Sequence, residues 1–252
     1  MENTKHEAPA ADFGRLKGII FDYGGTLDTR GTHWSHVIYE MYGREGLEIP
    51  YDSFRDAYVE AERELARTRH ILPHHNFLDL MRIKIRIEFD WLVARGLMTK
   101  EVAEAKADAV ARDCYDFARS CIEEVKPSLE ALAAEYPMVL VSNFYGNVET
   151  VLLDFGIRRY FGEIVESSVV GIRKPDPAIF ALGVKALGLK PEEVLVVGDS
   201  LRKDILPAES IGCMTAWIKG PGWTAEEDAL EHPSQVESLE KLAKAILRNL
   251  NK

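Results

Sequence analysis

Asp22 stands at the end of a short apolar run and directly before a glycine turn, in the segment 19–28 (IIFDYGGTLD). A short apolar run that stops at glycines is typical of a buried strand that ends abruptly. A carboxylate at such a place can attack phosphorus and carry the phosphoryl group as an aspartyl-phosphate. The same carboxylate could also cap the following turn. The function of Asp22 therefore depends on which residues lie beside it in the fold.

Two later apolar runs also end in polar residues of useful type. Residues 138–141 lead to Ser142 and Asn143, and residues 194–197 lead through Gly198 to Asp199. Each pair alone would be interpreted as a turn after a strand. Because the carboxyl ends of parallel strands share one edge of a sheet, we expect these residues to converge on Asp22.

A lysine and a further aspartate complete the set. Lys174 lies in segment 173–177 (RKPDP), where two prolines keep the chain extended and prepare the start of a helix. Asp204 follows Asp199 at the start of another helical stretch, where an aspartate is often only a cap. A carboxylate nucleophile, a hydroxyl, a lysine and an acidic pair have one common use. They can hold a phosphoryl group together with a divalent cation.

The second half of the chain alternates between strand-like and helix-like segments. This alternation predicts an α/β fold, a doubly wound parallel sheet with helices on both faces. We expect strands at 16–21, 138–141, 164–165, 194–197 and 214–218, and helices at 128–136, 148–155, 177–187, 204–211 and from Ser238 through Leu247.

The region from residue 34 to residue 122 has a different character. It lacks strand-like runs, and the stretches 51–69, 77–95 and 99–122 have helical spacing of apolar residues. We therefore predict an all-helical cap inserted after the first strand. The predicted domains are a flexible tail at 1–14, an α/β core at 15–30 and 126–252, and a helical cap at 31–125.

Composition restricts the class of protein. The chain has 252 residues, 46% of them hydrophobic, and a formal net charge of −10, which argues against a general nucleic-acid binder. No apolar run approaches the ~20 residues of a membrane span, and the polar start lacks the apolar stretch of a signal peptide. Three cysteines, an odd number without metal-type spacing, fit a reducing compartment. We predict a cytoplasmic protein without a nucleic-acid or membrane partner, and the sequence does not indicate its oligomeric state.

These motifs together resemble the haloacid dehalogenase superfamily, a large group of mostly Mg²⁺-dependent phosphatases. The segment 22–28 is similar to the family's first motif, Ser142 stands at the second, and Lys174 lies in the third. The segment 198–204 (GDSLRKD) is similar to the fourth. The resemblance covers about residues 16–28 and 127–247, and it implies a Rossmann-like core with a cap inserted after the first motif.

The resemblance also implies a role for each residue. Asp22 would be the nucleophile and a ligand of Mg²⁺, and Lys174 would neutralise the charge gathered at the site. Hard oxygen ligands suit Mg²⁺, which keeps several waters and prefers phosphate as a partner. The metal ligands would be Asp22, the backbone carbonyl of Gly24, Asp199 and Asp204. The phosphoryl oxygens would be held by Thr26, Ser142, Asn143 and Lys174.

One departure from the family pattern concerns Gly24. The family's phosphatases have a second aspartate at this position, which protonates the leaving alcohol and later activates water. Losing a general acid–base group typically costs ~10²–10⁴ in rate. Asp28 or a cap histidine could replace it, although Asp28 is also expected to shape the following turn. The histidines in or near the cap are His33, His36, His70, His74 and His75.

Three alternatives to a phosphatase remain. The phosphonoacetaldehyde-cleaving branch also has a small residue at this position, but it needs a cap lysine, and Lys84 is the first lysine of this cap. The true dehalogenases usually have a tyrosine there and lose the metal-site pattern, whereas this chain has Tyr23 one place early and keeps Asp199 and Asp204. A phosphate- or ligand-binding pseudoenzyme would keep the fold without turnover. We predict a Mg²⁺-dependent phosphatase that acts on a small phosphorylated metabolite.

Overall fold

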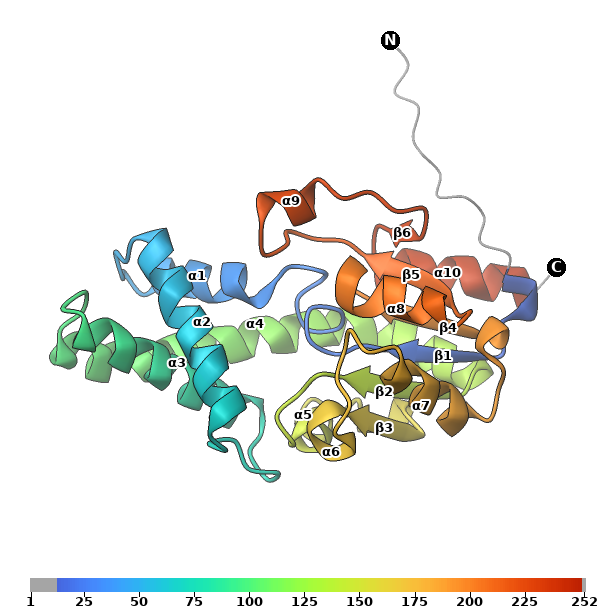
Figure 1. The fold of residues 1–252 in the computed structure, drawn as a ribbon, viewed down its shortest axis with the longest axis horizontal. Helices are drawn as coiled ribbons and strands as arrows, with labels where there is room; N and C mark the ends of the chain where they lie inside the picture. Colours follow the sequence, from blue (N-terminus) through green and yellow to red (C-terminus); the bar gives the residue numbers. More distant parts are fainter. Residues whose placement is uncertain (1–12, 251–252) are drawn as a thin grey trace, which may run out of the picture.

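Six parallel strands form one sheet in the computed structural model, which describes residues 13–250. Their order is β3-β2-β1-β4-β5-β6, with β1 near the middle (Figure 1). The predicted α/β class and parallel sheet are confirmed, and β6 is an additional strand of two residues. The strands are β1 Gly18–Phe21, β2 Met138–Ser142, β3 Glu163–Glu166, β4 Val194–Gly198, β5 Met214–Ile218 and β6 Gln235–Val236.

The strand register aligns the ends of the central strands. Phe21, the last residue of β1, pairs with Leu140 of β2 on one side and with Val197 of β4 on the other. The residues that follow these pairs therefore emerge together at the carboxyl edge of the sheet. This register places Asp22 between the ends of β2 and β4.

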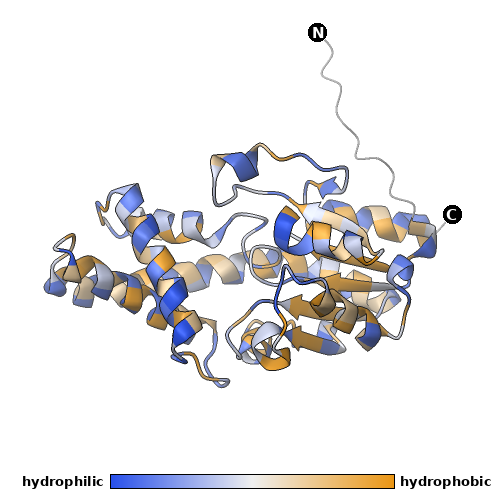
Figure 2. Cartoon of the chain, viewed as in Figure 1, coloured by the Kyte–Doolittle hydropathy of each residue, from blue (hydrophilic) through white to orange (hydrophobic). Residues whose placement is uncertain are grey.

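Helices cover both faces of the sheet. Side chains alternate between faces along a strand. Accordingly Ile20 and Val196 belong to the apolar cluster that includes residues of α7 (Ala178–Leu187) and α8 (Leu206–Ser210). Ile19 and Phe21 belong to the cluster that includes residues of α4 (Lys100–Glu135) and α10 (Leu239–Leu250). Figure 2 shows the central strands as hydrophobic along their length, as expected for a sheet buried on both faces.

A helical region lies at one end of the sheet, and α4 runs from this region along the core (Figure 1). Helices α1 to α3 and the first part of α4 correspond to the predicted cap. The helices are α1 Trp34–Arg44, α2 Tyr51–Arg67, α3 Phe77–Ala94, α4 Lys100–Glu135, α5 Val148–Asp154, α6 Ser167–Val170, α7 Ala178–Leu187, α8 Leu206–Ser210, α9 Ala225–Asp228 and α10 Leu239–Leu250.

The expectation of two helices separated near Pro127 is wrong, because α4 continues through this proline. Proline removes one backbone hydrogen bond from a helix interior. Here Ile122 before it and Leu129 after it are both fully buried. Because α4 packs against α3 in the cap and against α10 in the core, tertiary contacts hold both halves in line. The predicted cap limit at residue 125 therefore falls inside a helix, and the division into domains stays a prediction.

Several smaller expectations can be compared with residues 13–250. The predicted tail at 1–14 lies almost wholly outside this range, and residues 13 and 14 begin the short 3-10 helix Phe13–Arg15. Cys114, Cys121 and Cys213 are buried free thiols. Within the described range, no helix has both the length and the hydrophobicity that crossing a bilayer requires.

Candidate active site

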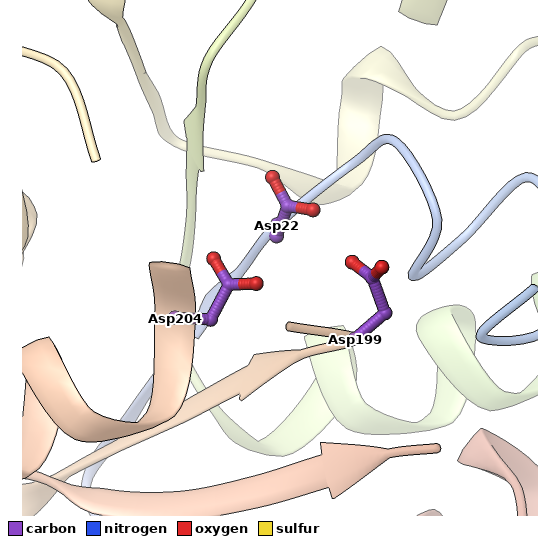
Figure 3. A group of neighbouring side chains, drawn as sticks. All are labelled: Asp22, Asp199 and Asp204. Carbon is purple, nitrogen blue, oxygen red and sulfur yellow. The ribbon is translucent and has the colours of Figure 1, made fainter. Parts of the chain in front are cut away.

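Three aspartates meet at the carboxyl edge of the sheet. Asp22 follows β1, Asp199 follows β4, and Asp204 lies in the short helical segment Leu201–Ile205. One carboxylate oxygen from each residue lies within 4.8 Å of the others, and Figure 3 shows the three carboxylates gathered around a common space. The structure thus brings together Asp22 and Asp199, which the strand-end pattern predicted to converge, and it adds Asp204 from the helical segment that follows.

Lys174 joins two of these aspartates. Its Nζ lies 2.5 Å from Oδ1 of Asp22 and 2.7 Å from Oδ1 of Asp204, and its side chain is only 3% exposed. Burial opposes the charged form, but Asp204 and Asp22 outweigh it and raise the pKa of Lys174, so the ammonium persists. Ser142 Oγ donates to the same Asp22 oxygen over 3.1 Å. One oxygen of Asp22 is therefore held by a cation and a hydroxyl.

The negative charge at this site exceeds what Lys174 can balance. Burial and the neighbouring carboxylates of Asp204 and Asp22 raise the pKa of Asp199 well above its usual range. Burial and Asp22 also raise the pKa of Asp204, although Lys174 opposes this. A divalent cation with hard-oxygen preference would relieve the repulsion, so the donor set fits Mg²⁺.

Gly25 shows how closely the chain approaches Asp199. Its φ is +93°, in the left-handed region, and a Cβ at this position would lie 2.3 Å from Asp199 Oδ2. Its amide donates to Asp28 Oδ1 over 2.7 Å. Only glycine can therefore occupy position 25 without displacing the carboxylate of Asp199.

Asn143 is used differently from the prediction that it binds phosphate. Its Oδ1 accepts from the Lys174 amide over 2.9 Å, and its Nδ2 donates to the Lys174 carbonyl over 3.0 Å. Both the oxygen and the nitrogen of the Asn143 side chain thus form hydrogen bonds with the backbone of Lys174. Asn143 is placed to position Lys174, and its direct contact with a phosphoryl group stays a prediction.

Thr26 lies between two carboxylates. Its Oγ1 is 3.2 Å from Asp22 Oδ2 and 3.1 Å from Asp199 Oδ1, and the residue is buried. A hydroxyl has a single proton to donate, so it serves one carboxylate at a time. Thr26 is not among the residues that line the adjoining cavity, and its predicted contact with phosphoryl oxygens also stays a prediction.

Gly24, the residue at the unusual position, faces open space. It lines the cavity, its φ lies outside the left-handed region, and a Cβ added to it would meet no atom within 4 Å. Neither backbone strain nor crowding therefore explains a glycine here. The backbone carbonyl of Gly24 as a metal ligand remains a prediction.

A cavity of about 1310 Å³ lies between the cap and the core and reaches Asp22, Asp199, Asp204 and Lys174. Its cap side includes Tyr58 and Glu62 of α2 and Lys84 of α3. Pockets for small molecules commonly measure ~300–1,000 Å³. The cavity therefore has room for more than a phosphoryl group.

A buried polar cluster in the cavity wall was not foreseen from the sequence. Glu62 pairs closely with Lys84 Nζ, and the Tyr145 hydroxyl, from the loop after β2, lies 3.1 Å from each Glu62 oxygen. The cluster thus ties two cap helices to the core. A signal was present, because Lys84 and Glu88 fall among the buried apolar positions of α3, where charges are unusual.

Lys84 lines the cavity but carries a stable charge. Burial opposes this charge, yet Glu62, Tyr145 and Glu88 raise the pKa of Lys84 above its ordinary value. A Schiff base requires an unprotonated amine. The environment of Lys84 therefore disfavours the phosphonoacetaldehyde-type chemistry considered from the sequence.

Two residues considered above as replacements for the missing acid, Asp28 and His33, line the cavity, and only Asp28 has a pKa that suits an acid. Burial raises the pKa of Asp28 to about 7, and its two oxygens accept from the Gly25 amide and from Trp34 Nε1. Among the five histidines proposed above, only His33 lines the cavity. Burial and Lys203 lower the pKa of His33 to about 3, so its imidazole is neutral. His36 instead contacts the Gly222 carbonyl through Nε2 at 2.7 Å.

The sequence pattern of the haloacid dehalogenase-like hydrolases matches residues 16–212. A glyceraldehyde 3-phosphate phosphatase of Pyrococcus furiosus is 42% identical over 212 residues, which cover 81% of each chain. One from Methanopyrus kandleri is 44% identical, but the match covers only 27% of this chain and 29% of that protein. The crystal structure of the L-2-haloacid dehalogenase PA0810 has the same fold, with a TM-score of 0.59, 20% identity, and coverage of 91% of this chain and 98% of that one.

Proposed function

The chain belongs to the haloacid dehalogenase-like hydrolase family, and on this basis we propose that it is a Mg²⁺-dependent phosphatase with Asp22 as its nucleophile. The proposal rests mainly on the environment of the Asp22 carboxylate. One of its oxygens is held by Lys174 and Ser142, and Asp199 and Asp204 complete an acidic trio beside a large cavity. A phosphatase name on a relative that is 42% identical supports the same activity.

The proposed reaction has two displacements at phosphorus. First an Asp22 oxygen bonds to phosphorus while the bond from phosphorus to the leaving oxygen breaks. A water oxygen then bonds to the same phosphorus, and the bond to Asp22 breaks to release inorganic phosphate. Lys174 and Ser142 orient the Asp22 carboxylate. Asn143 positions the backbone of Lys174, and the Thr26 hydroxyl contacts the other oxygen of Asp22. When bound by Asp22, the Gly24 carbonyl, Asp199 and Asp204, Mg²⁺ would supply charge neutralisation at the phosphoryl group.

Protonation of the leaving oxygen has no dedicated residue at position 24. Either solvent or Asp28 in the cavity wall must supply this proton. Both are less effective general acids than a carboxyl group at position 24 would be. We therefore expect slow turnover, and turnover that depends strongly on the quality of the leaving group.

The second candidate is a phosphate-binding pseudoenzyme, and the absence of an acid at Gly24 favours it. Dehalogenation is less well supported, because it needs no metal and leaves the acidic trio of Asp22, Asp199 and Asp204 without a use. The dehalogenase PA0810 shares the fold with this chain at only 20% identity, and this likeness supports the fold but not the chemistry.

A phosphate-release screen over sugar phosphates, nucleotides and phosphonates, with and without Mg²⁺, tests the proposal. We expect phosphate release to require Mg²⁺. Asp22→Asn should lower the rate of release by ~10³-fold or more, because the nucleophile is lost. Asp90→Asn, at an exposed position on α3, serves as the control and should retain wild-type turnover. Phosphate binding without release from any compound would establish the pseudoenzyme instead. Chloride release from a 2-haloacid without metal would establish a dehalogenase.

A further inference from the structure

The walls of the cavity carry exposed cations that have no ion pair with any acid among residues 13–250. Two come from the cap, at the end of α2 and just after it, and three come from the core, on the loop before α7 and on the helical segment beside Asp204. We call this set the cationic wall, and its members are Arg63, Arg69, Arg173, Arg202 and Lys203.

Most of the remaining charges at the cavity are balanced locally. Lys84 pairs with Glu62, and Arg67 pairs with Glu64 on the same helix. In the buried floor, three carboxylates and Lys174 leave two negative charges, which one divalent cation would match. Two acids of the cavity lining lie outside these pairs, Asp28 and Glu227, and they offset only part of the charge of the five cations of the cationic wall. The cationic wall is therefore a local surplus of positive charge.

This surplus stands out against the composition of the chain. The formal net charge of the protein is −10, so random placement of charges would make a negative cavity more common than a positive one. A positive cavity in a negative protein raises the local concentration of anionic ligands and orients them.

The cationic wall differs in exposure from the groups that would hold the phosphoryl group. Lys174 is buried against Asp22, whereas Arg63, Arg69, Arg173 and Arg202 are exposed side chains of the cavity lining. Arginine guanidinium groups bind carboxylates and phosphates through paired hydrogen bonds. The volume of about 1310 Å³ leaves space for such a group in addition to a phosphoryl group.

We propose that the substrate's leaving group carries a second anionic group, a carboxylate or a second phosphate, that binds the cationic wall between the cap and the core. This inference rests on the proposed phosphatase function and adds the class of substrate to it. Exposed charge pairs are individually weak and are screened by salt. Several acting together should give a preference of about 10-fold or more in kcat/KM at low ionic strength.

Two matched pairs of substrates test the proposal. Glycerol 3-phosphate and 3-phosphoglycerate differ by a carboxylate, and fructose 6-phosphate and fructose 1,6-bisphosphate differ by a second phosphate. We expect the more anionic member of at least one pair to be preferred by about 10-fold or more, and added NaCl to reduce the preference. Preference in one pair alone identifies the second group as a carboxylate or as a phosphate.

Variants assign the preference to the cationic wall. Arg63→Gln on the cap and Arg202→Gln on the core should each reduce the ratio of kcat/KM within the preferred pair by ~3-fold or more. Arg112→Gln is the matched control, because Arg112 lies on α4, pairs with Asp108 and does not line the cavity. Ratios near one in both pairs, or a preference that both variants retain, would overturn the proposal.

Calorimetric titration of Asp22→Asn with the same four compounds separates this inference from the proposed function. Binding that favours the more anionic compound, in a protein whose wild type releases no phosphate from these four compounds or from any compound of the phosphate-release screen, would refute the phosphatase and support the cationic wall. Phosphate release with equal affinity and equal kcat/KM for the two members of each pair would support the phosphatase and refute the role of the cationic wall.

Discussion

Replacing Gly24 by aspartate should accelerate a phosphatase that lacks only its acid. The position accepts the change, because a Cβ there meets no atom within 4 Å and φ lies outside the left-handed region. Substitutions without clash or strain usually alter the free energy of unfolding by ~0.5 kcal/mol or less. The effect of Gly24→Asp on turnover can therefore be measured without a large loss of folded protein.

The expected gain is ~10-fold or more. A placed general acid–base contributes ~10²–10⁴, which corresponds to ~2.7–5.4 kcal/mol of activation free energy. Part of this is offset, because a fourth carboxylate enters beside Asp22, Asp199 and Asp204, whose repulsion already raises the pKa of Asp199. Bound Mg²⁺ would reduce that cost, so the assay should contain saturating Mg²⁺.

The choice of substrate makes the assay specific for acid catalysis. An alkyl phosphate has a poor leaving group that needs a proton, whereas p-nitrophenyl phosphate releases a stable phenolate. We expect Gly24→Asp to raise kcat/KM for the alkyl phosphate more than for p-nitrophenyl phosphate. Gly24→Asn, which has the same shape without an acid, should give no such gain.

The neighbouring glycine provides a contrast within the same turn. Gly25→Ala should lower activity strongly, because its Cβ would lie 2.3 Å from Asp199 Oδ2 at a φ of +93°. Equal turnover of wild type, Gly24→Asp and Gly24→Asn on alkyl phosphates would refute the idea that only the acid is missing. A loss in Gly24→Asp with retained folding would show that the enzyme draws its proton from elsewhere, and Asp28→Asn would then test Asp28 as the source.

Three further predictions concern positioning, metal and pH. Asn143→Ala should lower kcat ~10-fold, because it removes the two hydrogen bonds that hold the Lys174 backbone. Tm should change little, because the buried ion pairs of Lys174 remain, and steady-state kinetics and thermal melts measure the two effects. Mg²⁺ at 100 times its Kd should stabilise the fold by about 2.7 kcal/mol and raise Tm, and Asp199→Asn should show a smaller rise; an equal rise in both would place the cation elsewhere. Burial raises the pKa of Glu88 from 4.5 to about 7, so its protonated form favours folding below pH 4.5 and this contribution is lost as pH rises through 7. The stability of wild type relative to Glu88→Gln should therefore fall by about 3 kcal/mol between pH 4.5 and pH 8, as urea denaturation would measure, and a constant difference would contradict the assigned pKa.

The catalytic edge of the sheet could be predicted from sequence because its determinants are local. The apolar runs before Asp22, Ser142 and Asp199 are short, and glycines or turn residues end them, so each strand and its last residue can be located without knowledge of contacts. Parallel pairing then brings the ends together whatever the intervening chain does. Short segments such as β6 and α6, with two and four residues, lack this signal.

The course of α4 shows where local rules were insufficient. Pro127 is a valid reason to expect a break, because proline removes a hydrogen bond and disfavours the helix interior. The helix continues because Ile122 and Leu129 are buried on either side of it, against partners far away in the chain. The energy of that packing is absent from any local reading of residues 120–130.

The sequence by itself determined the class of fold, the nucleophile candidate and the acidic residues around it, since each follows from residue type and position at a strand end. Only the tertiary structure decided that Asn143 grips the Lys174 backbone, that Glu62 and Lys84 meet Tyr145, and that cations from the cap and the core face one cavity. The physical reason is the distance along the chain. Hydrogen bonds and charges act over a few ångströms in space, and residues such as Glu62 and Tyr145 reach that range only after the helices of the cap pack on the sheet.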